Sequence, residues 1–281
     1  MREKAVLVLN PVAGKRKKIK ESILEILSTK YKLEVFQSEG KKETLKILYS
    51  LKPETVIIAG GDGTINSVLP YIYETGATLG ILPFGSGNGL ARNLKIPLNP
   101  ERAARKLLKP KRLRVDLGII NDEIYFINVA GVGFDGYIAH EFEKSEKRGI
   151  PPYVISGLKG YFNFSEFNYK FEDKEGKAFL IAFANFQQYG GEARIAPGAK
   201  PGDGYIDIVF LRKPPLSYAI ANFPRLFTGR LEKLKLYNKI RRKELKIDIT
   251  PPQLSHHDGE AGPLLSHINL TVKKRAINLL R

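Results

Sequence analysis

The feature that most constrains this chain is the alternation of short apolar runs with amphipathic stretches over its first hundred residues. Between the runs, apolar residues recur three or four positions apart, as at Ile19, Ile23, Ile26 and Leu27, which is typical of helices that pack on a sheet. Strands that alternate with helices predict a parallel sheet with helices on both faces, whose ligands bind beyond the carboxyl ends of the strands. The apolar runs of strand length are residues 4–10, 33–36, 55–60 and 79–84.

The pattern changes after about Arg114, where long strand-like runs follow one another with few helical stretches. This texture predicts an antiparallel, β-sandwich-like second domain. A length of 281 residues fits two domains. We place the first domain at residues 1–113 and the second at 114–272, and the pattern leaves open whether residues 273–281 return to the first domain. The strand-like runs are residues 124–132, 178–186, 205–211 and 245–249.

Composition excludes several classes of protein. The chain has no cysteine, which rules out a disulfide scaffold, a thiolate metal site and a cysteine nucleophile. It has no apolar run long enough for a membrane-spanning helix, and its first residues lack the apolar stretch of a signal peptide. We therefore expect a soluble, cytoplasmic protein. The net charge of +17 favours polyanionic partners, which are nucleic acid, anionic lipid or phosphorylated small molecules.

Three loops that follow predicted strands carry the residues expected of a phosphate site. Gly-Gly-Asp-Gly-Thr at residues 60–64 stands between a strand and a helix, with Asn66 in the first helical turn. Its glycines let backbone N–H groups approach an anion, and Thr64 caps a helix whose positive end faces the same anion. Asn10 to Gly14 and Gly85 to Gly89 follow two other strands. One such loop alone is also compatible with an ordinary tight turn, whereas three at one sheet edge predict a binding crevice.

Neither standard nucleotide motif fits these loops, since none of the three contains a P-loop sequence or a G-x-G-x-x-G. The three loops together resemble the diacylglycerol kinase catalytic-domain family, which includes bacterial lipid kinases, sphingosine kinases and ceramide kinases. Gly-Gly-Asp-Gly-Thr alone is shared with NAD kinases, so the later motifs distinguish the lipid branch. Those motifs are Val115-Asp116, residues 128–135, residues 196–204 and Asp258-Gly259-Glu260.

This resemblance implies that ATP binds in a cleft between the two domains. It implies a nucleotide site made from the three loops and a hydroxyl after the second strand. The expected nucleotide-binding residues are Asn10, Pro11, Gly14, Ser38, Gly60, Gly61, Asp62, Gly63, Thr64, Asn66, Gly85, Ser86, Gly87 and Asn88.

The resemblance also implies Mg²⁺ and a general base. Asp62 is expected beside the phosphates as a catalytic, metal or water-network residue, because a carboxylate near a triphosphate requires an intervening cation. Asp116 is similar to a further acidic member of that network. Asp258 matches the residue expected to accept the proton of the lipid hydroxyl, and Glu260 is the reserve candidate. The adjacent His256 and His257 lack metal-pair spacing, and we expect them in a loop.

Two positions depart from the family pattern. The resemblance implies a second, structural Mg²⁺ held by Asp203 and the backbone carbonyl of Tyr205, but Gly202 stands where many relatives have another aspartate, which weakens the site for a hard cation. Gly89 stands where many relatives have an acidic residue that contacts the lipid head group. The choice of head group is therefore open. The aromatic segment at residues 142–167 suits either lipid contact or the core.

We expect an ATP-dependent lipid kinase that transfers the γ-phosphate to the hydroxyl of a membrane lipid, with diacylglycerol as the acceptor. The expected partners are this lipid and an anionic membrane surface at the inner face of the membrane, with no nucleic acid, and the resemblance allows a homodimer. A sphingoid or other lipid kinase and an NAD kinase are the enzymatic alternatives. A module that binds anionic membranes or nucleic acid without catalysis is the remaining alternative.

Overall fold

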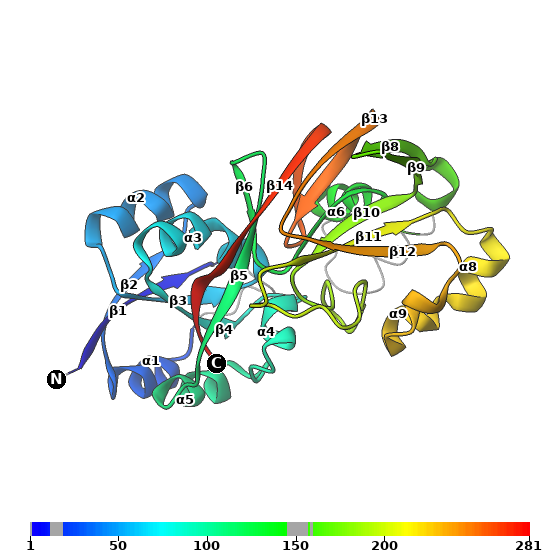
Figure 1. Ribbon diagram of the computed structural model, residues 1–281. Helices are drawn as coiled ribbons and strands as arrows, with labels where there is room; N and C mark the ends of the chain where they lie inside the picture. The colour runs from blue at the N-terminus through cyan, green and yellow to red at the C-terminus, as the bar shows by residue number, and fades with distance from the viewer. Residues whose placement is uncertain (1, 12–18, 145–156, 158–159) are drawn as a thin grey trace. The chain divides into compact units, whose positions relative to one another are not determined.

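The computed structural model describes residues 2–11, 19–144, 157 and 160–281 (Figure 1). The chain divides into two compact units, which are described separately below. Residues 1–115 and 275–281 form the N-terminal unit, and residues 116–274 form the C-terminal unit. Two strands, β5 (Arg112–Ile120) and β14 (Glu260–Leu280), contribute residues to both units.

The N-terminal unit is built on a parallel sheet with the strand order β2-β1-β3-β4. The end of β14 extends this sheet, since Asn278 and Leu279 pair in parallel with Thr78 and Leu79 of β4. Every residue of β3 is buried, because helices cover both faces of a central parallel strand. The first four strands are β1 (Glu3–Leu9), β2 (Tyr31–Gln37), β3 (Thr55–Gly60) and β4 (Thr78–Pro83).

Helices lie on both faces of this sheet. In Figure 1, α2 (Lys41–Leu51) and α3 (Asp62–Thr75) lie on one side of the strands, and α1 (Glu21–Ser28) and α5 (Pro100–Leu108) lie on the other. The start of α5 is fixed by its sequence, because the Asn99 side chain accepts the N–H of Arg102 at 3.0 Å. The short helix α4 (Gly89–Asn93) follows β4.

The C-terminal unit is built on an antiparallel ladder with the order β12-β11-β10-β7-β13-β14. The end of β13 pairs with β7, whereas residues 248–250 of β13 pair with β8. Strand β8 also pairs with β9, and β5 pairs with β6. The remaining strands are β6 (Ile124–Phe126), β7 (Val129–Gly133), β8 (Phe167–Phe171), β9 (Lys174–Ala178), β10 (Leu180–Ala184), β11 (Ile206–Leu211), β12 (Tyr237–Arg242) and β13 (Glu244–His257). The helices of this unit include α6 (Phe134–Lys144), α8 (Leu216–Asn222), α9 (Pro224–Thr228) and the 3-10 turn η1 (Leu231–Lys233).

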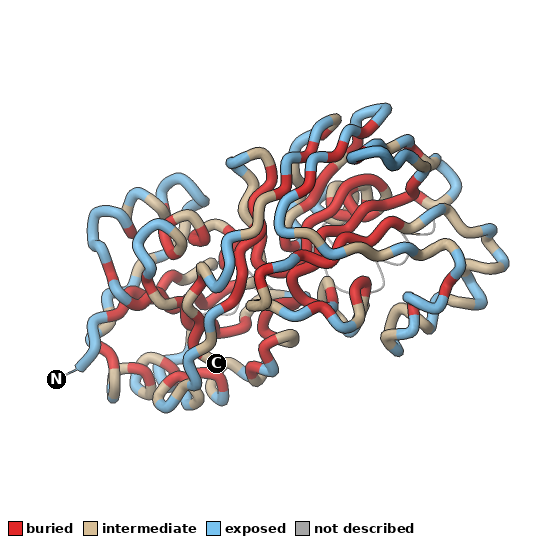
Figure 2. Tube along the Cα trace, viewed as in Figure 1, coloured by how far each residue is buried: buried red, intermediate tan, exposed pale blue. Residues whose placement is uncertain are grey.

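Strand β10 explains why apolar runs in this unit are continuous rather than alternating. Ile181 and Phe183 pack into a cluster with β8, β13 and β14, whereas Leu180 and Ala182 pack into a second cluster on the opposite face. All five residues of β10 are therefore buried, as Figure 2 shows for the central strands of this unit.

The predicted fold class is confirmed. The N-terminal unit has a parallel sheet with helices on both faces, and the C-terminal unit is an antiparallel β structure. The structural boundary between the units falls between residues 115 and 116, and the prediction placed it between 113 and 114. No helix within the described residues has the length and apolar character that crossing a bilayer requires.

Candidate functional site

The carboxyl ends of the parallel strands lie at one edge of the N-terminal sheet. Leu9 of β1 pairs with Ala59 of β3, and Gly60 of β3 pairs with Pro83 of β4. The three predicted loops therefore leave the sheet side by side. The side-chain amide of Asn10 donates a hydrogen bond of 2.7 Å to the hydroxyl of Thr64, which joins the first loop to the second.

At Gly61 and Gly85 the second and third loops meet backbone to backbone. A Cβ atom on Gly85 would lie 2.6 Å from the Cα of Gly61, which no side chain tolerates. The same crowding exists within the second loop, where a Cβ on Gly60 would lie 2.6 Å from the Thr64 hydroxyl oxygen. This glycine-lined contact, which we call the glycine cradle (residues 60–63 and 85–87), stands at the N-terminus of the 14-residue helix α3. It fits a phosphate group, because backbone N–H groups and the positive helix end are the donors that phosphates bind.

The carboxylate of Asp62 holds the third loop in place. Its two oxygens accept the backbone N–H groups of Gly89 at 2.8 Å and Leu90 at 3.0 Å, so Asp62 caps α4 from outside that helix. Burial raises the pKa of this carboxyl, and the two N–H bonds oppose that rise. Each oxygen keeps further lone pairs for a cation or water.

The other predicted nucleotide residues occupy the same edge or its immediate support. Ser38 follows β2, where its N–H bonds to the Leu9 carbonyl and its hydroxyl lies 2.8 Å from that of Thr44. Asn88 adopts a left-handed φ of 48° and its amide bonds to the Gly85 carbonyl at 2.7 Å, which shapes the third loop. Asn66 is buried within α3. Pro11 and Ser86 are exposed, and Gly14 lies outside the described residues.

Asp116 organises a loop of the C-terminal unit. One carboxylate oxygen of this fully buried residue accepts the N–H of Gly202 at 3.0 Å and the N–H of Gly204 at 2.6 Å. Gly202 and Gly204 have φ values of 130° and 86°, so the loop relies on backbone that glycine adopts readily. Asp116 therefore holds the loop that carries Asp203 and Tyr205.

An arginine stands at the proposed second metal site. One oxygen of Asp203 accepts the N–H of Tyr205 at 3.0 Å, and the other is paired with the guanidinium of Arg241. The Nε of Arg241 also lies 3.3 Å from an Asp207 oxygen, because Asp207 and Arg241 are cross-strand partners in β11 and β12. The single positive charge of Arg241 pairs with both carboxylates, so a second Mg²⁺ would meet a fixed cation there and these residues do not fit it.

The two candidate bases lie in one hairpin between β13 and β14. Asp258 and Gly259 form its two-residue turn, with φ values of 52° and 89°, which is the backbone of a type I′ turn. Asp258 is 7% exposed, and its carboxylate accepts the N–H groups of Ile127, Asn128 and Val129. Glu260, which pairs with His257 across the hairpin, is exposed.

The expectation that His256 and His257 lie in a loop is wrong. Both belong to β13, which continues to the turn because His256 and His257 pair with Gly131 and Ala130 of β7. The His256 ring lies 3.2 Å from the Asp135 carboxylate, which also accepts the hydroxyl of Tyr189 at 3.0 Å. Sequence reasoning missed this cluster because its three members are far apart along the chain.

The predicted residues thus form two local groups. The nucleotide residues and Asp62 belong to the N-terminal unit, whereas Asp116, Asp203, Tyr205, Asp258 and Glu260 belong to the C-terminal unit. The described residues contain no group of three or more histidine, aspartate or glutamate side chains placed to hold a metal ion. The cleft in which ATP is expected stays a prediction.

Solved structures with this fold include two from Bacillus anthracis. The crystal structure of a diacylglycerol kinase from Bacillus anthracis aligns with 99% of this chain and 96% of its own at a TM-score of 0.73 and 20% identity. A second Bacillus anthracis crystal structure aligns over the same shares at a TM-score of 0.78 and 21% identity. At these identities the likeness establishes the fold.

Sequence comparison gives the family. The family model of the diacylglycerol kinase catalytic domain matches residues 4–120, and that of the YegS C-terminal NAD kinase beta sandwich-like domain matches residues 128–281. A Yersinia pestis protein named "Probable lipid kinase YegS-like" is 29% identical over 97% of this chain and 95% of its own. A Chromohalobacter salexigens protein of that name is 35% identical over 56% of this chain, an alignment that spans about half (53%) of that relative. The chain belongs to the YegS-like lipid kinase family.

Proposed function

We propose that this protein transfers the γ-phosphate of ATP to the hydroxyl of diacylglycerol in an anionic membrane, giving phosphatidic acid. The observation that carries the proposal is the glycine cradle, where a Cβ on Gly85 would collide with Gly61 at the N-terminus of α3. Such a site suits a phosphate chain, because the glycines at the Gly61–Gly85 contact leave backbone N–H groups open to an anion beside the positive helix end. The family match directs the transferred phosphate to a lipid.

The chain's own residues bind and orient the phosphates. The N–H groups of the cradle and the positive end of α3 stabilise negative charge that grows during transfer, and Asp62 keeps the third loop in register by capping α4. Mg²⁺, when it is bound with ATP, supplies further neutralisation, held by phosphate oxygens and a protein carboxylate such as Asp62. Alignment of hydroxyl and phosphate is the main requirement of phosphoryl transfer.

We assign proton acceptance to Glu260 rather than to Asp258. Three backbone N–H groups bond to the buried Asp258 carboxylate, which makes it an anchor of the hairpin. Glu260 is exposed two residues later and is able to meet a substrate. In this step the lipid hydroxyl oxygen forms a bond to the γ-phosphorus, the bond to the bridging β–γ oxygen breaks to leave ADP, and the hydroxyl proton passes to Glu260.

The membrane association of this proposal rests on charge. An excess of 17 positive charges favours anionic lipid at the inner face of a membrane, with a contribution of about 1 kcal/mol for each lysine or arginine near the surface.

The test is transfer of labelled γ-phosphate, with Mg²⁺, into mixed micelles that contain diacylglycerol, with sphingosine, ceramide and NAD as parallel acceptors. We expect label in diacylglycerol with the wild-type protein and none with Glu260→Gln. Label in another lipid alone would support phosphoryl transfer to a lipid but contradict diacylglycerol as the acceptor. Label in NAD alone would identify an NAD kinase. Absence of label in every lane would refute the proposal.

A further inference from the structure

Two short helices of the C-terminal unit leave their apolar residues exposed. None of the residues of α8 or α9 is buried, although their sequences, LSYAIAN and PRLFT, are largely apolar. Ile220 is 65% exposed and Phe223 is 48% exposed. We call residues 214–231, which contain both helices, the arm. Figure 2 shows its helices, which are labelled in Figure 1, in the colours of intermediate and exposed residues. A helix normally buries its apolar face, so an exposed one indicates a binding surface.

The arm has an inner and an outer side. Tyr218 and Leu226 pack against the apolar cluster that contains β10. Ile220 is two residues from Tyr218, which places it about 200° around the helix and so on the outer side. Leu216, Ile220 and Phe223 are spaced four and three residues apart, and Phe223 keeps helical backbone, so the three share one stripe. We call this the outer stripe.

The arm is fixed to its unit by hydrogen bonds at both ends. The N–H of Arg194 bonds to the Leu226 carbonyl at 2.8 Å, and the hydroxyl of Tyr161 bonds to the Pro214 carbonyl just before α8. The outer stripe is therefore part of the folded C-terminal unit, and it is exposed to a partner without a change of conformation.

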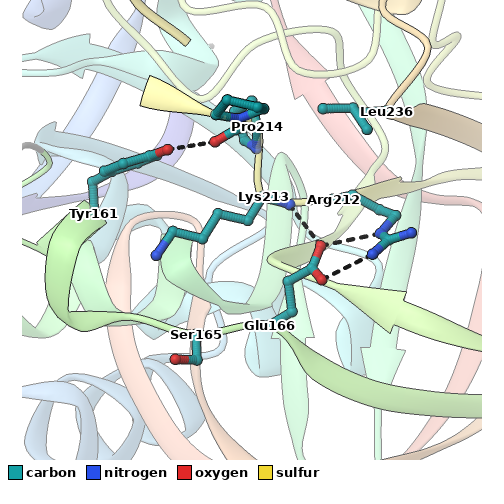
Figure 3. A pocket seen from close by; sticks show the side chains of 8 residues that line it. Tyr161, Ser165, Glu166, Arg212, Lys213, Pro214 and Leu236 are labelled. Carbon is teal, nitrogen blue, oxygen red and sulfur yellow. Dashed lines mark hydrogen bonds and ion pairs between the residues drawn. The ribbon is translucent and has the colours of Figure 1, made fainter. Parts of the chain in front are cut away.

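A cavity of about 610 Å³ lies at the base of α8, but its charges are already used within the protein (Figure 3). Arg212 donates two bonds, of 3.1 and 3.0 Å, to the Glu166 carboxylate, and the N–H of Lys213 donates to the same group at 2.9 Å. The Lys213 ammonium bonds to the Phe164 carbonyl at 2.7 Å. These bonds hold the residues just before α8 in place, so the charged groups of the cavity are not available to a ligand. The outer stripe is the part of the arm that faces solvent.

The charge of the arm indicates which kind of partner it binds. Residues 214–231 include two cations, Arg225 and Arg230, and contain no aspartate or glutamate. The carboxylate of the next residue, Glu232, lies 3.8 Å from the ammonium of Lys239. Exposed isoleucine and phenylalanine beside cations alone match the boundary between acyl chains and anionic head groups. A protein partner would have to present a purely acidic apolar groove, which is a narrower requirement.

We propose that the outer stripe, with Arg225 and Arg230, docks the C-terminal unit on an anionic phospholipid bilayer. The inference deepens the proposed function and rests on it, since a membrane lipid is the acceptor there. It adds a membrane-contact element outside the residues expected to bind the nucleotide or accept the proton.

Vesicle flotation without ATP tests the inference, with phosphatidylcholine vesicles compared with vesicles that also contain phosphatidylglycerol. We expect the wild type to float with the anionic vesicles and the double variant Ile220→Glu/Phe223→Glu to bind them roughly tenfold or more weakly. Leu51→Glu, at a 44% exposed position in α2, is the matched control and should bind as the wild type does. Equal binding by the wild type and the double variant would overturn the inference, as would an equal loss in the control.

Two further measurements separate the alternatives. Arg225→Gln/Arg230→Gln should weaken binding to anionic vesicles by about fivefold for each arginine, and unchanged binding would contradict the role of charge. Light scattering without vesicles should give the same mass for the wild type and the Ile220→Glu/Phe223→Glu variant. A dimer that only the wild type forms would assign the stripe to a second copy of the chain instead.

The proposed reaction is tested apart from docking with a short-chain diacylglycerol dispersed in solution. The Ile220→Glu/Phe223→Glu variant should phosphorylate this acceptor at the wild-type rate and lose activity only on vesicles. A loss on both acceptors would overturn a purely docking role. Absence of transfer by the wild type on any lipid would refute the proposed function, while the flotation result would still decide whether the stripe binds membranes.

Discussion

The carboxylate of Asp258 accepts a hydrogen bond of 2.7 Å from the backbone N–H of Asn128. It also accepts the N–H groups of Ile127 and Val129, at 3.0 and 3.2 Å, and the Asp258 N–H returns a bond to the Val129 carbonyl at 2.9 Å. These bonds tie the turn between β13 and β14 to the start of β7. The two acidic residues at this turn therefore differ in their surroundings. Asp258 anchors the turn through backbone hydrogen bonds, whereas the Glu260 carboxylate is exposed to solvent.

Asp258→Asn should reduce stability, because an amide offers one acceptor oxygen where three N–H groups converge. We expect the free energy of unfolding to fall by about 1–3 kcal/mol in urea titration. Glu260→Gln, at an exposed position, should unfold as the wild type does and lose about 100-fold or more in kcat. An Asp258→Asn protein of wild-type stability that binds ATP and transfers no phosphate would return the base to Asp258.

Gly85→Ala should disrupt the glycine cradle, because its Cβ would lie 2.6 Å from the Gly61 Cα. Forcing the loops apart should cost about 1–3 kcal/mol of stability. Calorimetric titration should show ATP affinity reduced by about tenfold or more, since 1.4 kcal/mol corresponds to a factor of ten. Gly87→Ala is the matched comparison for stability, because its Cβ would meet nothing closer than an Asp62 oxygen at 3.7 Å. Equal melting temperatures for the two variants would contradict the backbone contact.

Arg241→Gln should destabilise the C-terminal unit in a pH-dependent way. Burial raises the pKa of Asp207, and the cations Lys239 and Arg241 oppose this rise. Without Arg241 the folded-state pKa of Asp207 moves further up, so the variant loses stability as pH rises through that pKa and recovers it below, where the protonated acid needs no cation. We expect the free energy of unfolding to fall by about 1–2 kcal/mol at pH 7, a modest loss because the Arg241 side chain is half exposed to solvent. The loss should become smaller towards pH 4, where Asp207 is protonated.

Urea titration of the Arg241→Gln variant at both pH values measures this difference. Lys243→Gln is the control, because Arg241 and Lys243 both lie over the Tyr205 ring, at 5.0 and 5.2 Å from its centre. Removal of Lys243 should change stability by no more than a few tenths of a kcal/mol at either pH. A loss of the same size at pH 4 and pH 7 would show that Arg241 acts through packing alone.

The wild-type melting temperature, measured without nucleotide, should be the same in EDTA and in Mg²⁺. The reason is that Arg241 already pairs with both Asp203 and Asp207, so a divalent cation would meet a fixed positive charge. A rise in melting temperature on addition of Mg²⁺ that Asp203→Asn abolishes would establish a metal at this loop after all.

Much of the N-terminal site was predictable from local sequence. Asn10, Thr64 and Gly85 were expected at one edge because parallel strands align their carboxyl ends, and the Asn10–Thr64 bond and the Gly61–Gly85 contact lie there. The bond that the Gly89 N–H donates to Asp62 was not predictable, because its two partners are 27 residues apart and no spacing rule links them.

The sequence by itself determined the kinds of elements, their order and the places where glycine is required, since periodicity and backbone preference act between near neighbours. Only the tertiary structure decided which polar groups meet. It buried Asp258 under three N–H groups, placed Arg241 between two carboxylates through the pairing of β11 and β12, and joined His256 to Asp135 across 121 residues. Such contacts depend on how strands pair and pack over long separations, which a local pattern does not encode.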